Sequence, residues 1–157
     1  MKNLLKLIVC IAVCQLAGVI GSIFTMENIP TWYATLTKPP LQPPNWLFAP
    51  VWITLYTLMG ISLFLVIKKG FDFPGVKAAT AIFAVQLVLN TLWSIVFFGM
   101  HELLISVVII AALWLLILMT MLKFKPISFT AAVLLLPYLL WVSFASYLNS
   151  AIYVLNK

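Results

Sequence analysis

The sequence predicts an all-α protein, a bundle of five transmembrane helices with almost no domain outside the membrane. Of its 157 residues, 65% are hydrophobic and 8% are charged, whereas a soluble domain has about 45–50% apolar and about 25% charged residues. Five segments lack any charged residue over the length of about 20 residues that a helix needs to cross a bilayer. They are residues 7–26, 46–67, 78–100, 103–122 and 127–156. This composition excludes a disordered chain, a disulfide scaffold and a soluble α/β enzyme.

The predicted helices form one domain over residues 1–157, at about 4–26, 46–68, 78–100, 103–123 and 127–154. The first apolar run follows Lys2 and Lys6 and so resembles a secretory signal peptide. It is longer than the apolar core of about 7–15 residues in such peptides, and no cleavage site with small residues follows it. We therefore expect this run to remain as the first transmembrane helix.

Three of the four connections between the predicted helices are short. Residues 99–102 join the third helix to the fourth so tightly that these two helices must be antiparallel neighbours. Residues 68–77 and 123–126 form the other short links. His101 stands alone in the tightest of these turns, beside Glu102, and we expect it to have a structural role.

The remaining connection, residues 27–45, is long and holds five of the nine prolines. Proline fixes φ and has no backbone N–H to donate, so we expect this segment to be non-helical and stiff. A long rigid loop that carries Trp32 and Tyr33, in a protein with few other loops, is predicted to be functional.

The nine lysines divide unevenly between the two sides of the predicted bundle. Seven fall on the side of the N-terminus, and two, Lys38 and Lys157, fall on the other side. Short cytoplasmic loops carry an excess of Lys and Arg, which predicts a cytoplasmic N-terminus and an outer Pro-rich loop. Because these lysines occur singly or in pairs beside apolar runs, the net charge of +6 does not indicate a nucleic-acid partner.

The last four spans contain no Asp, Glu, Lys, Arg or His. Such residues inside a membrane mark proton relays and ion pathways, so their absence argues against an ion-driven transporter and against a hydrolase with paired carboxylates. No His, Cys or carboxylate cluster has the spacing of metal ligands. Cys10 and Cys14 share one helix face, where packing is the expected role. We predict no catalytic residue, no metal and no cofactor.

Aromatic and amide side chains are the remaining candidates for a site. Trp52 and Tyr56 are four residues apart and share a helix face, and Trp141, Ala145 and Asn149 advance by fours along another. Taken singly, each aromatic ring is typical of an interface anchor or of core packing. Three tryptophans lie several residues inside their spans, where the indole N–H needs a partner. An Asn at membrane depth also needs a hydrogen-bond partner, either on a neighbouring helix or on a ligand.

Together these residues predict a ring-lined cavity for a flat apolar ligand with a few polar groups. The candidate ligand-binding residues are Trp32, Tyr33, Trp52, Tyr56, Asn90, Trp93, Trp141, Ala145 and Asn149.

Three blocks of the chain resemble the signature of one family. They are WYATL at 32–36 with KPPLQPPNWLFAPVW at 38–52, LNTLWS at 89–94 with FFG at 97–99, and PYLLWVSFA at 137–145 with LN at 148–149. This order and spacing resemble the tryptophan-rich sensory protein family, TspO, whose mitochondrial members are the translocator protein or peripheral benzodiazepine receptor. The chain is similar to the bacterial members, which implies a bacterial cell membrane.

The resemblance implies a bundle that commonly dimerises and that binds porphyrins such as protoporphyrin IX, with sterols and benzodiazepine-type drugs as ligands of some members. It implies ligand contacts at Trp52, Asn90, Trp141 and Ala145, and a covering loop at Trp32 and Tyr33. One departure is Ala49, where a glycine is common, and this alanine is expected to stiffen the joint between loop and helix.

Three functions are open at this point. The first is a membrane receptor or carrier that binds a tetrapyrrole between its helices for transport, sensing or regulation. The second, which the resemblance implies for some bacterial members, is light-dependent porphyrin breakdown that involves Trp52 and Trp141. The third is a structural or regulatory protein that uses small residues in the first helix, such as Gly18 and Ser22, for close helix contacts.

Overall fold

The computed structural model describes residues 2–157, which form an all-α bundle. Five of its helical segments are long and apolar enough to cross a membrane, which confirms the predicted fold class. The elements are α1 (Lys2–Asn28), α2 (Trp32–Thr35), α3 (Asn45–Ile67), α4 (Val76–Ser94), the π-helical turn η1 (Ile95–Gly99), α5 (Leu103–Phe124), α6 (Phe129–Leu134) and α7 (Leu136–Asn156).

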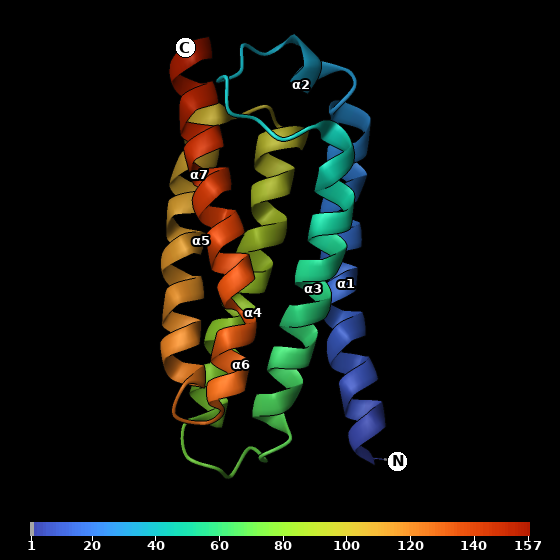
Figure 1. The fold of residues 1–157 in the computed structure, drawn as a ribbon, viewed down its shortest axis with the longest axis vertical. Coiled ribbons are helices and arrows are strands. Elements are labelled where there is room, and N and C mark those ends of the chain that lie inside the picture. Colours follow the sequence, from blue (N-terminus) through green and yellow to red (C-terminus); the bar gives the residue numbers. More distant parts are fainter. Residues whose placement is uncertain (1) are drawn as a thin grey trace.

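The long helices run along one axis, with the N-terminus at one end of the bundle and the C-terminus at the other (Figure 1). The segment that contains α2 lies across the end that carries the C-terminus (Figure 1). Helix α1 packs mainly on α3, and α5 packs on α4 and α7, whereas α3 and α7 approach each other little. A space between α3 and α7 can therefore open inside the bundle.

The outer surface of α1 is apolar, as a lipid-facing helix requires. Leu5, Leu16 and Ile23 are exposed, while Cys10 and Cys14 are buried against the other helices. With no water in the hydrocarbon region, exposed leucines carry no penalty there, and the helical backbone satisfies its own hydrogen bonds.

The half of the bundle near the 68–75 connection is filled by a packed core. Phe83 of α4 stacks on Phe124 of α5 with ring centroids 5.8 Å apart. Helices α1 and α3 touch closely at Gly60, where an added Cβ would lie 2.5 Å from the Cα of Ile11. This tight half leaves the opposite half, under the α2 segment, as the place for a cavity.

The structure corrects the expectation that residues 27–45 contain no helix. Helix α1 continues to Asn28, and Trp32–Thr35 forms one helical turn. The reason is local, since the prolines of this segment lie at Pro30 and from Pro39 onward, so no proline falls within Trp32–Thr35.

The last span, expected as one helix over about 127–154, is divided at Leu135 into α6 and α7. Pro137 occupies the first turn of α7. Because proline has no N–H to donate and its ring clashes with the carbonyl four residues earlier, Pro137 favours a break in the helix just before it.

Candidate functional site

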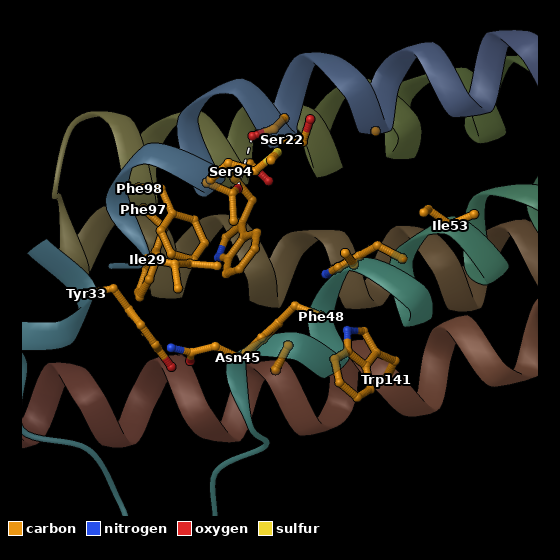
Figure 2. Close-up of a pocket in the computed structure, with 18 of the residues that line it drawn as sticks. Ser22, Ile29, Tyr33, Asn45, Phe48, Ile53, Ser94, Phe97, Phe98 and Trp141 are labelled. Carbon is orange, nitrogen blue, oxygen red and sulfur yellow. Dashed lines mark hydrogen bonds between the residues drawn. The ribbon is translucent and has the colours of Figure 1, made fainter. Parts of the chain in front are cut away.

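A cavity of about 460 Å³ lies between α1, α3, α7 and η1, beneath the segment that contains α2. Figure 2 shows side chains from these elements converging on it. Its wall comes from positions within 15–26 of α1, 45–56 of α3, 93–98 of α4 and η1, and 141–152 of α7, together with Ile29, Pro30 and Tyr33. None of the lining residues is charged.

Most of the predicted site residues line this cavity. Trp52 and Tyr56 contribute from α3 and Trp93 from the end of α4, while α7 presents one stripe with its expected spacing of four. The predicted residues on the wall are Tyr33, Trp52, Tyr56, Trp93, Trp141, Ala145 and Asn149.

Asn90 does not line the cavity, because the structure places it one layer deeper, behind Tyr56. The Tyr56 hydroxyl donates to the Asn90 Oδ1 at 2.6 Å, and the Asn90 Nδ2 donates to the Tyr138 hydroxyl at 2.6 Å. The Tyr138 hydroxyl in turn donates to the Oε1 of Gln86 at 2.9 Å. The Asn90 amide therefore finds its hydrogen-bond partners on neighbouring helices, not on a ligand in the cavity.

Trp32 also lies off the wall. Its ring stacks on His101, with centroids 4.2 Å apart and planes inclined by 15°, and meets the Phe97 ring edge-on. The His101 Nε2 is 2.9 Å from the Asn28 Oδ1 at the end of α1. Trp32 therefore fastens the segment above the cavity to the 99–102 turn.

Residues 29–44, which we call the cover segment, close the cavity at the C-terminal end of the bundle. At one side the segment is held by the contact of Trp32 with His101. At the other side, the Thr37 N–H donates to the Asn156 Oδ1 at 2.9 Å, and the Asn156 Nδ2 donates to the Thr37 carbonyl at 2.8 Å. Tyr33 is buried between these two attachments.

The indoles on the wall differ in their hydrogen bonds. Trp93 donates to the Oδ1 of Asn149 at 2.9 Å, and Asn149 donates to the hydroxyl of Ser106 at 3.0 Å. Within residues 2–157, Trp52 and Trp141 donate to no side chain or carbonyl. Figure 2 shows the Trp141 ring in the space between α7 and α3. Two indole N–H donors therefore remain free for a polar group on a bound molecule.

The π-helical turn brings two consecutive rings to the cavity. The Met100 N–H bonds to the Ile95 carbonyl at 2.9 Å, five residues back, which widens the last turn of this span. Phe97 and Phe98 both line the cavity as a result, and Phe97 stacks on Trp93 at 5.4 Å. Such turns are frequent at functional sites, and the sequence pattern does not reveal them.

Helix α1 forms a wall that the sequence interpretation missed. Gly18, Gly21 and Ser22 line the cavity, whereas the sequence pattern predicts only close helix packing for the small residues of this helix. A Cβ at Gly18 would lie 2.5 Å from the Tyr56 ring, so this glycine makes room for that ring. From the sequence alone, a small residue that allows a close helix contact cannot be distinguished from one that makes room for an aromatic ring.

The site thus offers aromatic faces, two free indole donors and no charge. Among residues 2–157, no group of three His, Cys, Asp or Glu side chains is placed to hold a metal ion. Rings of this kind stack on flat apolar molecules, and the indole donors can orient them.

The comparisons with known proteins agree with this architecture. Residues 10–155 match the model of the TspO/MBR family. The chain is 46% identical over 155 residues to the tryptophan-rich protein TspO of Chlorobaculum tepidum, covering 99% of this chain and 98% of that protein. It is 46% identical to the tryptophan-rich protein TspO of Archaeoglobus fulgidus, covering 98% and 99%. It is also 36% identical to the translocator protein of Bos taurus, covering 86% and 80%.

Proposed function

This chain belongs to the TspO/MBR family of membrane proteins, and from that premise we propose that it is an integral membrane receptor or carrier for porphyrins. Protoporphyrin IX and related flat hydrophobic molecules would bind in the cavity between the helices. This binding would have a role in tetrapyrrole transport, sensing or regulation. The names of its relatives describe a tryptophan-rich protein and a translocator rather than a reaction.

The observation that carries the proposal is the uncharged cavity walled by aromatic rings. Its volume of about 460 Å³ falls within the range of about 300–1,000 Å³ typical of small-molecule sites. Each 100 Å² of apolar ligand surface removed from water contributes about 2.5 kcal/mol, against an association cost of about 4–15 kcal/mol. A large flat ring system provides enough such surface, and Trp52 and Trp141 provide donors for its polar atoms.

The cavity wall includes residues that also face the surroundings of the bundle. Val19 and Met26 of α1 are 56% and 72% exposed, and Ile53 of α3 is 59% exposed. These side chains would contact lipid on one side and the ligand on the other. An apolar ligand that is dissolved in the bilayer would therefore have a route into the cavity between α1 and α3.

The proposal includes an orientation and an assembly. The lysine distribution favours a cytoplasmic N-terminus with the cover segment outside the cell membrane. The exposed apolar faces of α1 and α5 would accommodate a second copy as well as lipid, in a homodimer. Sterols and benzodiazepine-type drugs are further candidate ligands, because they too are largely flat and apolar.

Light-dependent porphyrin breakdown is a second candidate function, favoured by the free indoles of Trp52 and Trp141 on the cavity wall. Excited porphyrin and oxygen would supply the reactive species, and the indoles would act as redox partners. If this is the activity, the absorbance of the bound porphyrin decays in light and is stable in darkness. Turnover in darkness would contradict this assignment.

Tryptophan fluorescence quenching by protoporphyrin IX tests the binding proposal. Ala145→Phe places a ring in the cavity. It should lower the affinity for protoporphyrin IX at least about 5-fold, because the new ring occupies space that the ligand needs. Ala111→Phe adds the same ring on an exposed position of α5 and should leave the affinity unchanged. Equal affinity of the wild type and Ala145→Phe for protoporphyrin IX would show that the porphyrin does not bind in this cavity.

A further inference from the structure

The net charge of the chain lies at one end of the bundle, the end that carries the N-terminus (Figure 1). Seven of the nine lysines belong to the segments at this end, and Asp72 is the one acid among them. The segments at the opposite end hold two lysines and two acids, namely Lys38, Lys157, Glu27 and Glu102. The formal net charge of +6 therefore belongs to the first end alone.

Five of these seven lysines share one surface, because the two connections that carry them touch. The connections are residues 68–77 and residues 123–128. A Cβ at Gly75 would lie 3.7 Å from the Cδ1 of Ile127, which is an ordinary van der Waals distance. Phe124 and Ile127 are buried at this junction, whereas the lysines beside them are exposed. We call this surface the basic face, and its lysines are Lys68, Lys69, Lys77, Lys123 and Lys125.

The ammonium groups of the basic face have no negatively charged partner within residues 2–157. In that part of the chain, Lys38 at the other end is the one lysine whose ammonium donates a hydrogen bond, and no ion pair joins Asp72 to a lysine. The Lys68 Nζ lies 5.6 Å from the centroid of the Phe64 ring, a contact that keeps this ammonium near its helix. The charges of the basic face are therefore available to an anion outside the chain.

Aromatic side chains lie exposed among these lysines. Phe71, Phe73 and Phe129 are 51%, 42% and 67% exposed. An open hollow lined by residues 71–75, 77 and 78 brings Phe71 and Phe73 beside Lys77. At a membrane surface, such rings bury their apolar area near the boundary between acyl chains and headgroups, while lysine side chains extend their ammonium groups to the headgroups.

We propose that the basic face binds the phosphate groups of anionic membrane lipids, with its three exposed phenylalanines at the boundary between headgroups and acyl chains. Lysines clustered beside a membrane-spanning helix attract anionic lipids, and basic pockets between such helices bind their headgroups. The lysines of the basic face flank the ends of membrane-spanning helices, where a lipid phosphate is the nearest anion. This surface lies away from the cavity, so the inference holds whichever molecule the cavity binds.

The same lysines also predict the orientation of the chain, and the two roles can be separated by experiment. A lysine that only directs insertion acts while the chain enters the membrane. It requires no preference for anionic lipid in the purified, folded protein. Lipid binding by the basic face does require this preference.

The test reconstitutes the full chain in phosphatidylcholine vesicles that contain a trace of spin-labelled phosphatidylglycerol or spin-labelled phosphatidylcholine. The fraction of each label that the protein immobilises gives the relative association constant of the two lipids. The variant of the basic face is Lys77→Gln with Lys125→Gln, one change in each connection. Its matched control, Lys38→Gln with Lys157→Gln, removes the same charge from the opposite end. A third variant, Asp72→Asn, removes the one acid.

The wild type should associate with phosphatidylglycerol about 3- to 10-fold more strongly than with phosphatidylcholine at low salt. This preference should shrink in about 1 M salt, because exposed charges are screened. Lys77→Gln with Lys125→Gln should lower the preference at least about 2-fold, with unchanged phosphatidylcholine association, and Asp72→Asn should raise it. The control should keep the wild-type preference. Equal association of both lipids with the wild type, or an equal loss in the control, would overturn the proposal.

Discussion

The Tyr56 hydroxyl donates a 2.6 Å hydrogen bond to the Asn90 Oδ1, and this bond joins the cavity wall to the interior of the bundle. Tyr56 lines the cavity, whereas Asn90 is buried behind it. Through Tyr138 the network continues to Gln86, so three helices share one set of polar contacts. The position of the Tyr56 ring, and with it the inner surface of the cavity, depends on an amide that does not line the space.

Asn90→Ala should lower the free energy of unfolding by about 1–3 kcal/mol, because it leaves two buried hydroxyls with fewer partners. Tyr138→Phe should have a similar effect, since it removes the partner of both Asn90 and Gln86. Thermal unfolding in detergent measures both changes. Tyr153→Phe, which removes a hydroxyl outside this network, is the control and should change stability by less than about 0.5 kcal/mol. If Asn90→Ala has the same free energy of unfolding as the wild type, this network does not stabilise the bundle.

Gly60→Val should separate α1 from α3, because a Cβ at this position would lie 2.5 Å from the Cα of Ile11 and backbone atoms cannot move aside cheaply. We expect a loss of about 1–3 kcal/mol in the free energy of unfolding, as for other overpacked contacts. Ala112→Val, on an exposed position of α5, is the matched control. If both variants unfold at the wild-type temperature, the close approach of α1 and α3 is not as described.

His101→Ala should loosen the cover segment without unfolding the bundle. The substitution removes the ring that stacks on Trp32 and the contact with Asn28. Hydrogen exchange should become faster in residues 29–44, while exchange in the middle of α5 stays unchanged, since local openings report local contacts. Unaltered exchange in the cover segment would show that this stack does not hold it.

The Tyr33 phenol should titrate above its ordinary pKa of 10.0, because burial disfavours the ionised form. A raised pKa in the folded state stabilises the fold below pH 10, and this contribution is lost as the pH rises through the raised value. Tyr33→Phe should therefore lack the corresponding loss of stability above pH 10. The difference in tyrosinate absorbance between the wild type and this variant measures the pKa, and a value at or below 10 would contradict the burial of Tyr33.

The five spans could be predicted because composition and apolar run length determine them directly. The divisions within the spans could not be predicted as easily. The break at Leu135 and the turn at Trp32–Thr35 both depend on where prolines fall within one or two turns. The π-helical turn at Ile95–Gly99 is a change of hydrogen-bond register that leaves no mark in the pattern of apolar residues.

The part of the site on α3 and α7 could be anticipated, because the spacing of four puts Trp52 with Tyr56, and Trp141 with Asn149, on shared helix faces. The positions of Asn90 and Trp32 could not. A buried amide bonds to whatever donor tertiary packing brings near, and here that is Tyr56 rather than a ligand. Trp32 finds His101, a residue 69 positions away in the chain, and only the fold brings them together.

A crystal structure of the chain with protoporphyrin IX would show whether the ligand occupies the cavity between α3 and α7. We expect the macrocycle to lie beneath the cover segment, in contact with Trp52 of α3 and Trp141 of α7. A porphyrin bound on the lipid-facing surface of α5, with these indoles untouched, would contradict it.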